Sequence, residues 1–576
     1  MIPLQKHLTG YTPQHLIPDA LAGLVVGMVT IPQAIAYALL AGVPPEAGLY
    51  ACLLPMVLYA GTGSSKHLVV GPVAIAALMI VSTVSEYAPK FSSDYLNITN
   101  IICIEIALIF AFLRFLRLGA LVNLVSHPVL TGFINAAVIL IIISQLPILT
   151  GLQLEKDLSP IASFFSTLKQ SNEFNWLNIA LGILAIIFLV VFRYLIKMID
   201  CRVSNKNEKQ FSRSFIGLGP IFLVSISIFL VYSFEGKKIV ETVGFIPSGL
   251  PSLVVPSFEV DLWLSLLPAS LIIAMVTYIE SFSIATALSA RENTKINSHQ
   301  ELFALSIANL GAGFTGAYPV AGSFSRSSVN YHAGAKTPIS SLVCAVIIVL
   351  SLLFFTELFA LLPLTVLAGI VIISAVSLFD FKNIHERWKI HKLDTASELA
   401  TFFGVLLLGV ELGLLSGIFL SIAFFLRQSS NPKIVTVGRL PGTEYFRSDE
   451  RYQVETSPGT LIVRIDENIF FANADNIEIK LMSMSENYTS LKHLLVICSA
   501  VNLIDTTGLQ MLSRLNAHLK KSKTSLHLSD LKGTLLNKLN QTYFESRISG
   551  KVFTTANQGM EYLAKLSGEK GFVTNK

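Results

Sequence analysis

Two short stretches with the same layout decide the fold: 67-HLVVGPVAIAA-77 in the first half of the chain and 318-YPVAGSFSRSS-328 in the second. Each has a short extended approach, then a glycine, Gly71 or Gly322, then a segment shorter than the roughly 20 apolar residues that cross a bilayer. The second stretch also carries Arg326 and four serines inside a strongly apolar region. Paired, interrupted segments of this kind predict two half-helices that begin inside a membrane.

The composition supports a membrane protein. Of 576 residues, 52% are hydrophobic and only 14% are charged, against roughly 25% charged residues in soluble domains. The net charge of +5 comes without a basic run, which gives no indication of nucleic-acid binding. The five cysteines are scattered and form no CxxC pair, so we expect no disulfide framework, metal site or cofactor. The sequence shows no arrangement of a nucleophile and a base that would indicate an enzyme.

The apolar segments predict about 14 crossings when the half-length segments 72–86 and 322–334 are included. With the N-terminal segment 1–17 inside the cell, the cytoplasmic loops hold 16 Lys and Arg residues and the outer loops hold 5, as the positive-inside rule requires. The full-length candidates are 18–42, 46–62, 99–117, 124–149, 176–196, 214–233, 262–289, 300–316, 338–356, 363–378, 396–410 and 413–427.

The two halves form an internal repeat. Gln33 precedes Gly71 by 38 residues, and Glu280 precedes Gly322 by 42. We expect a transport domain over 18–428, with a first repeat at about 18–233 and a second at about 262–428. Seven spans in each repeat would place the halves in opposite orientations, as in many secondary transporters whose binding site lies between broken helices.

The starts of the half-helices predict an anion site. Pro72 suits a first helical position and Ser323 suits an N-cap, while Gly322 allows close approach to the backbone. Two helix N-termini that meet would direct free N–H groups and positive dipole ends at one point, to which Arg326 adds a full charge. The alternatives are that the serines form a packing face and that Arg326 extends to the membrane interface. Ser327 lies further along the helix, where packing suffices.

Glu280 lies within an apolar span, where a buried carboxyl can take up a proton near neutral pH. This favours proton coupling to anion movement; the alternative is a structural carboxyl bonded to nearby backbone. Gln33 and Tyr37, one turn apart in the first span, can offer an amide and a hydroxyl to the same pocket, although core packing also explains Tyr37.

After residue 428 the composition becomes polar, and we expect a linker over 429–459, a small α/β domain over 460–566 and a tail over 567–576. The strands TLIVRI and HLLVICSA alternate with amphipathic helices, which is typical of an α/β domain.

The assembled motifs resemble the sulfate permease (SulP) family, relatives of the animal anion exchangers. The resemblance rests on IPQAIAYALLAGVPPEAGLYACLLP, GTGSSKHLVVGPVAIAALM and NLGAGFTGAYPVAGSFSRSSVNYHAGAKTPIS, and the C-terminal marker LIDTTGLQML is similar to STAS domains. It implies 14 spans in two inverted halves, a core domain moving against a gate domain, a homodimer, and membrane lipid around it. The implied substrate-binding residues are Gln33, Tyr37, Val73, Ala74, Gly322, Ser323, Phe324, Ser325 and Arg326.

Two further positions follow from the resemblance. Sodium-coupled bicarbonate members carry an Asp and, four residues later, a Thr, where this chain has Glu280 and Ile284, so a sodium site is not expected and a proton-coupled carrier is favoured. Thr507 matches a residue that related antagonist domains phosphorylate, although Asp505 and Thr507 before a helix are also ordinary capping residues. A cytoplasmic protein partner at the STAS domain is a further expectation.

The sequence therefore predicts proton-coupled sulfate uptake by an integral protein of the bacterial inner membrane, with its N-terminus and STAS domain in the cytoplasm. Bicarbonate, chloride or dicarboxylate transport or exchange remains an alternative. A different class, a membrane-anchored STAS signalling scaffold, would leave the charged residues within the spans without a use.

Overall fold

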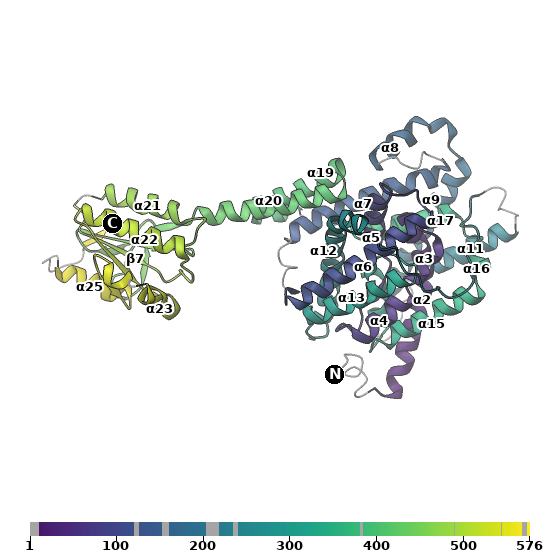
Figure 1. The fold of residues 1–576 in the computed structure, drawn as a ribbon, viewed down its shortest axis with the longest axis horizontal. Coiled ribbons are helices and arrows are strands. Elements are labelled where there is room, and N and C mark those ends of the chain that lie inside the picture. The colour runs from purple at the N-terminus through teal and green to yellow at the C-terminus, as the bar shows by residue number, and fades with distance from the viewer. Residues whose placement is uncertain are drawn as a thin grey trace. The chain divides into compact units, whose positions relative to one another are not determined.

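The computed structural model describes residues 11–119, 126–152, 160–202, 218–233, 240–380, 384–488, 490–542, 544–566 and 573–575. The chain divides into two compact units after Leu420, and each is described by itself. The first is almost wholly helical, and the second contains the large sheet (Figure 1).

The helices of the first unit follow the predicted spans closely. Each predicted segment contains at least one described helix, and the predicted span 46–62 is broken into two helices, α3 and α4. The helices are α2 (Pro13–Ala41), α3 (Pro45–Tyr50), α4 (Leu54–Thr62), α5 (Ala74–Val84), α6 (Ser93–Phe115), α7 (His127–Thr150), α8 (Pro160–Lys169), α9 (Trp176–Arg202), α11 (Gly219–Ser233), α12 (Val260–Ala290), α13 (Ser298–Phe314), α14 (Phe324–His332), α15 (Ile339–Phe354), α16 (Thr356–Phe359), α17 (Leu364–Val376), α18 (Ile384–Ile390), α19 (Lys392–Leu408) and α20 (Val410–Ser430).

Several helices are apolar enough to cross a bilayer. Among the described residues, 6 helices have both the length and the composition of a span, and 4 shorter apolar helices accompany them. The half-helix α5 is one of the shorter four, whereas α14 is shorter still and is polar, since it contains serines, Arg326 and Asn330. The number of crossings therefore remains a prediction, whereas the helical membrane architecture is clear.

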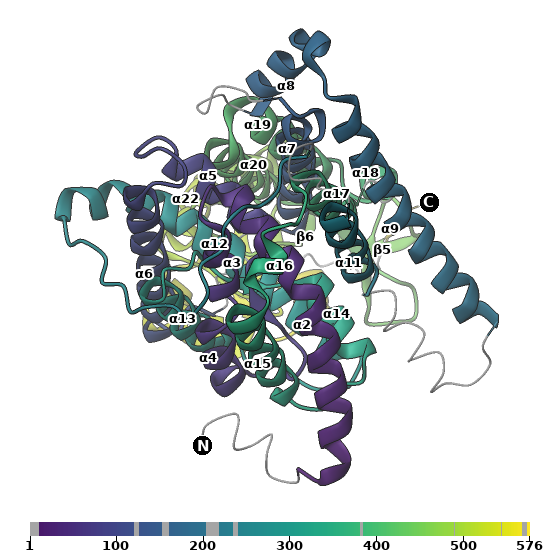
Figure 2. The same ribbon diagram turned by 90° about the vertical axis from the view of Figure 1, so that its right-hand side faces the viewer.

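The two predicted repeats meet at a pair of very short strands. β1 (Val70–Gly71) and β2 (Ala321–Gly322) pair antiparallel, with Val70 opposite Gly322 and Gly71 opposite Ala321. Antiparallel pairing of corresponding segments is what an inverted repeat produces. Helix α2 packs against both α14 and α15, as Figure 2 shows for the purple helix.

The second unit is an α/β domain. Its sheet has the strand order β10-β5-β3-β6-β7-β8-β9, with β4 paired to β3, and the run from β6 to β9 is parallel. The strands are β3 (Ile434–Arg439), β4 (Phe446–Ser448), β5 (Val454–Thr456), β6 (Thr460–Ile465), β7 (His493–Ile497), β8 (Ser525–Ser529), β9 (Val552–Phe553) and β10 (Val573–Asn575). The helices are α21 (Ala474–Glu486), α22 (Thr506–Lys521), α23 (Gly533–Gln541), α24 (Phe544–Arg547) and α25 (Ala556–Leu566).

Alternation along the strands places helices on both faces of this sheet. Leu494 and Val496 of β7 join a core formed with α21, α22 and α23, while Leu495 and Ile497 join a second core formed with α25. Figure 1 shows α22 and α25 on either side of β7.

The sheet begins earlier than the sequence predicted. The range 429–459, expected to be a linker, contributes β3, β4 and β5. These strands pair antiparallel at one side of the sheet, where few residues in each strand need to be buried. Their polar, turn-rich composition therefore hid them.

Candidate functional site

Hydrogen bonds hold the two interrupted segments together. The backbone N–H of Ser323 donates to the carbonyl of Val69 (3.1 Å), and the N–H of Val69 donates to Oγ of Ser327 (2.9 Å). Asn309 on α13 accepts from the N–H of Val320 (3.0 Å) and donates to the carbonyl of the same residue (3.1 Å). The approach to α14 is thus fixed by backbone and side-chain contacts from both halves of the chain.

Both short helices begin where these strands end. Val73 is the N-cap of α5 and has no capping side chain, whereas Oγ of the N-cap Ser323 accepts from the N–H of Arg326 at 3.5 Å. The first N–H groups of a helix have no acceptor within the helix, and they carry the positive end of its dipole. The geometry brings two such N-termini to one strand pair, an arrangement that suits an anion.

Pro72 does not occupy the first helical position that was predicted for it. Helix α5 starts at Ala74, so Pro72 lies before the N-cap. Its carbonyl has a different role, because it accepts a hydrogen bond from Nη2 of Arg326 at 2.7 Å. Proline limits the backbone here but leaves its carbonyl free to pair.

Arg326 is completely buried, with an exposed fraction of 0%. Apart from the bond to Pro72, its Nε and Nη1 atoms have no hydrogen-bond partner in the described structure. A Cβ atom added to Gly71 would lie 3.3 Å from the guanidinium and from Sγ of Cys52, so the absent side chain of Gly71 makes room for this charge. The alternative of an Arg326 that extends to the membrane interface is inconsistent with this burial.

The neighbouring residues of α14 differ in exposure. Phe324 is 46% exposed and Ser325 is partly exposed, while Ser323 is buried. On the opposing segment, Val73 and Ala74 are both buried. Of these five residues, only Phe324 and Ser325 of α14 reach open space.

Glu280 lies on α12 and is distinguished by an unpaired oxygen. Its Oε2 is buried without a hydrogen-bond partner, and the carboxyl interacts electrostatically with Arg326. Two other carboxyls in the described part of this unit are satisfied: Glu105 accepts from Ser270 (2.5 Å), and Glu301 accepts from the Ser64 and Tyr59 hydroxyls. A buried carboxyl with an unpaired oxygen can hold a proton with little rearrangement.

The predicted residues of α2 lie beside the same charges. The Oε1 atom of Gln33 is buried without a partner. The Tyr37 side chain interacts electrostatically with Arg326 and Glu280, and its hydroxyl lies within hydrogen-bonding reach of Ser374 on α17. Helix α2 also packs against both α5 and α14, so the predicted residues come from elements in mutual contact.

Sequence reasoning missed the side chains that position these segments. Asn309 clamps Val320, and Ser281 on α12 accepts a hydrogen bond from the N–H of Gly322 at 2.8 Å. Tyr318 is fully buried with an unpartnered hydroxyl and interacts electrostatically with Arg326. A polar residue within an apolar span, such as Asn309 in SIANLGAGF, was the available signal.

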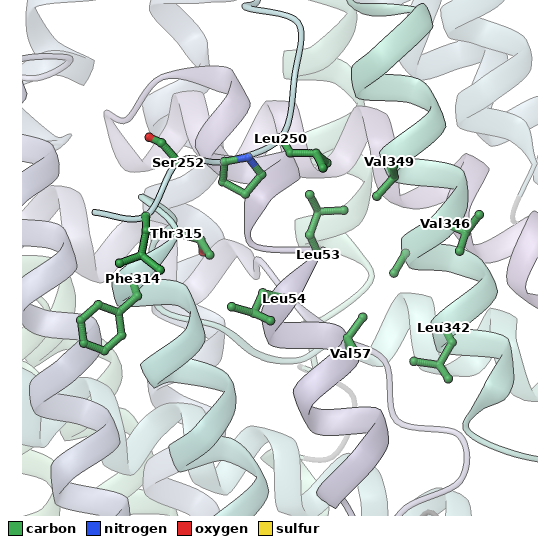
Figure 3. Close-up of a pocket in the computed structure, with 13 residues that line it drawn as sticks. Leu53, Leu54, Val57, Leu250, Ser252, Phe314, Thr315, Leu342, Val346 and Val349 are labelled. Carbon is green, nitrogen blue, oxygen red and sulfur yellow. The ribbon is translucent and has the colours of Figure 1, made fainter. Parts of the chain in front are cut away.

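An apolar cavity of about 590 Å³ lies elsewhere in this unit. Figure 3 shows Leu53, Leu54, Val346 and Val349 pointing into it. None of the predicted site residues lines this cavity, and apart from Ser252 and Thr315 its lining side chains are apolar and cannot replace the hydration of an inorganic anion. The lining is therefore a poor match for an inorganic anion.

Two other predicted features can be placed. Thr507 lies in the first turn of α22, where Asp505 is the N-cap and accepts from the N–H of Gly508 at 2.8 Å. The capping role expected for Asp505 is thus present, and phosphorylation of Thr507 stays a prediction. Among the described residues, no group of three or more His, Cys, Asp or Glu side chains could hold a metal ion.

The chain is thus a membrane protein that combines a helical unit containing two opposed half-helices with an α/β domain. Comparison with known proteins identifies the family. The family profile described as "Sulfate permease family" matches residues 16–401, and the profile for the STAS domain matches residues 451–559. The chain belongs to the sulfate permease family.

Individual relatives agree with this assignment. The chain is 34% identical over 528 residues to "Probable sulfate transporter 4.2" of Arabidopsis thaliana, which covers 90% of this chain and 76% of the relative. The fold is similar to murine Slc26a9, an anion transporter solved in the inward-facing state, with TM-score 0.88 and 22% identity over 98% of this chain and 94% of that one. The transmembrane domain of the cyanobacterial bicarbonate transporter BicA aligns with TM-score 0.59 and 19% identity, over 72% of this chain and 98% of that one.

Proposed function

We propose that this protein is a secondary active transporter that takes up sulfate together with a proton. The observation that carries the proposal is the meeting of the α5 and α14 N-termini at the β1–β2 pair, with the buried Arg326 guanidinium bonded to the carbonyl of Pro72 beside β1. Backbone N–H groups and a buried guanidinium favour an anion over a neutral solute. The relatives named as sulfate transporters support sulfate over other anions.

In the proposed site, donors come from the first turns of both helices and from side chains around them. Ser323 and Ser325 supply hydroxyls, and Val73 and Ala74 contribute backbone and shape. Arg326 acts through its field, because its side chain is fully buried and bonded to Pro72. Gln33, Tyr37, Gly322 and Phe324 complete the pocket.

Glu280 is the proposed proton carrier. Its ionised form would add a negative charge near an arriving anion, so protonation removes a repulsion and favours binding of both solutes together. Ile284, one turn later, is apolar and buried and offers no sodium ligand.

The test is uptake of radiolabelled sulfate into proteoliposomes with and without an inward proton gradient. Uptake should rise with the gradient, and Glu280→Gln should abolish that response. Glu105→Gln is the matched control, because Glu105 is another buried carboxyl in a membrane helix but accepts from Ser270. Sulfate uptake that ignores the gradient in the wild-type protein contradicts symport.

Bicarbonate, chloride or dicarboxylate transport is the second candidate, and the likeness of the fold to a bicarbonate transporter keeps it in view. Competition by each of these anions against labelled sulfate separates the candidates. If none of these anions is transported by the intact protein, the STAS scaffold hypothesis gains.

The remaining parts of the proposal concern the setting of the protein. We place it in a bacterial inner membrane as a homodimer, with the N-terminus and the STAS domain in the cytoplasm and no enzymatic step in its cycle. The STAS domain would then serve assembly or regulation through a cytoplasmic partner.

A further inference from the structure

Ser281 connects the proton-binding helix to the anion site. Its side chain is fully buried, and its Oγ donates to the carbonyl of Thr277 (2.6 Å) while accepting from the N–H of Gly322 (2.8 Å). The hydroxyl thus uses both its donor and an acceptor position, which fixes its orientation. Since Gly322 is buried, its N–H has no access to water if this acceptor is lost.

Gly322 occupies a critical position at the start of α14. It pairs with Val70 of β1 and directly precedes Ser323, the N-cap of α14. This hydrogen bond therefore connects the proposed anion-binding end of α14 directly to α12. A Cβ on Gly322 would lie 2.6 Å from Leu68, so the strand has little freedom to shift toward that side.

The two halves of the repeat differ at this point. In the first half, Val69 is bonded to Ser323 and Ser327, both of the α14 segment. The described residues of α2 make no hydrogen bond to β1 that would correspond to the Ser281 bond. Within the described residues, the bond from α12 to β2 is therefore specific to the second half of the repeat and is not a shared feature of both halves.

Ser281 is also the residue next to Glu280. We propose that Ser281 is a positioning residue that couples protonation of Glu280 to the anion-binding end of α14. This inference rests on the proposed proton-coupled function. When the charge of Glu280 changes, its interaction with Arg326 changes, and α12 and α14 keep a fixed separation through the Ser281–Gly322 bond. Proton and anion then raise each other's affinity by the same factor.

The experiment compares Ser281→Ala, Ser281→Thr and Thr277→Val in the full-length protein. Thr277 is the matched control, because it is buried on the same helix one turn earlier and its hydroxyl bonds only to carbonyls of α12. Sulfate KM is measured at external pH of about 6 and about 8, and the ratio of the two KM values reports the coupling between proton and anion. Hydrogen exchange of the peptide containing Gly322 is measured in parallel.

Ser281→Ala should reduce the ratio of KM values by about fivefold or more, toward one, and speed exchange at Gly322. Ser281→Thr keeps the hydroxyl and should retain both wild-type properties, and Thr277→Val should change neither. If Ser281→Ala matches Thr277→Val in the KM ratio and in exchange, the proposal is overturned.

The two proposals can fail separately. Wild-type protein whose sulfate KM is the same at both pH values overturns proton coupling itself, whatever Ser281 does. Faster exchange at Gly322 in Ser281→Ala, with an unchanged KM ratio in a protein that is proton-coupled, overturns only the coupling role of Ser281 and leaves the proposed function standing.

Discussion

The two half-helices share a backbone layout and differ in chemistry. Helix α5 begins at a buried Val73 and Ala74, and its first turn carries no polar side chain. Helix α14 has Ser323 as its N-cap and carries Ser325 and Arg326 within its first turn. Both start at the same strand pair, so the chemical difference between the two starts lies in their side chains.

The difference indicates a division of labour. The start of α5 supplies backbone donors and a rigid apolar wall, in which Val73 and Ala76 pack with Ala321 at the strand pair. The start of α14 supplies the serine hydroxyls and the charge of Arg326. Changes on α14 should therefore alter anion recognition, whereas conservative changes on α5 should alter stability.

Removal of the charge should have the largest effect. Arg326→Ala removes the buried positive charge and leaves the Pro72 carbonyl without its donor, so sulfate uptake should fall by about 100-fold. Arg193→Ala, which removes an exposed arginine of α9, is the control and should transport normally. Unchanged uptake by a folded Arg326→Ala protein would show that the charge of Arg326 is not needed for transport.

A methyl group added at Gly71 of β1, just before α5, should have the next largest effect. Gly71→Ala places a Cβ 3.3 Å from the Arg326 guanidinium and from Cys52, so it displaces the charge, and uptake should fall by about tenfold. In Gly61→Ala the new Cβ meets no atom within 4 Å, and uptake should stay at the wild-type level. Equal uptake by the two variants would show that the room beside Gly71 is not needed.

Loss of one hydroxyl should have a moderate effect. Ser325→Ala removes a partly exposed donor in the first turn of α14, and sulfate KM should rise about threefold to tenfold, the worth of one neutral hydrogen bond. Ser328→Ala, one turn later, should leave KM unchanged. A larger KM change at Ser328 than at Ser325 would place the anion further along the helix than we propose.

Shortening the apolar side chain of Val73, the N-cap of α5, should have the smallest effect on transport. Val73→Ala keeps every backbone donor of α5, so sulfate KM should stay within about twofold of the wild-type value. The lost packing against Ala76 and Ala321 should instead lower stability by about 1 kcal/mol, seen as a lower melting temperature in detergent. A large change in KM at unchanged stability would contradict the division between the two helices.

Much of the membrane unit could be predicted because apolar length and Lys and Arg distribution are direct consequences of the bilayer. The pairing of the segments around Gly71 and Gly322 was predictable from their spacing, and their antiparallel contact confirms that they meet. The bond from Arg326 to Pro72 was not, since a backbone carbonyl leaves no trace in the sequence.

Other features were hidden for physical reasons. Ser281 resembles any small residue in a membrane helix, and only the position of Gly322 reveals its role. Strands β3, β4 and β5 could not be predicted because their residues are mostly only partly buried and their segment is polar and rich in turns, which is the composition of a linker. The site residues themselves remain proposals that the variants above address.

The most direct test of the central claim is to locate a bound anion by anomalous diffraction from crystals grown with selenate, a heavy analogue of sulfate. We expect a selenium peak between the first turns of α5 and α14, within hydrogen-bonding distance of the backbone N–H groups that follow Val73 and Ser323 and out of direct contact with the Arg326 guanidinium. A selenium peak at any other place in the transmembrane unit, with none between these helix starts, would contradict it.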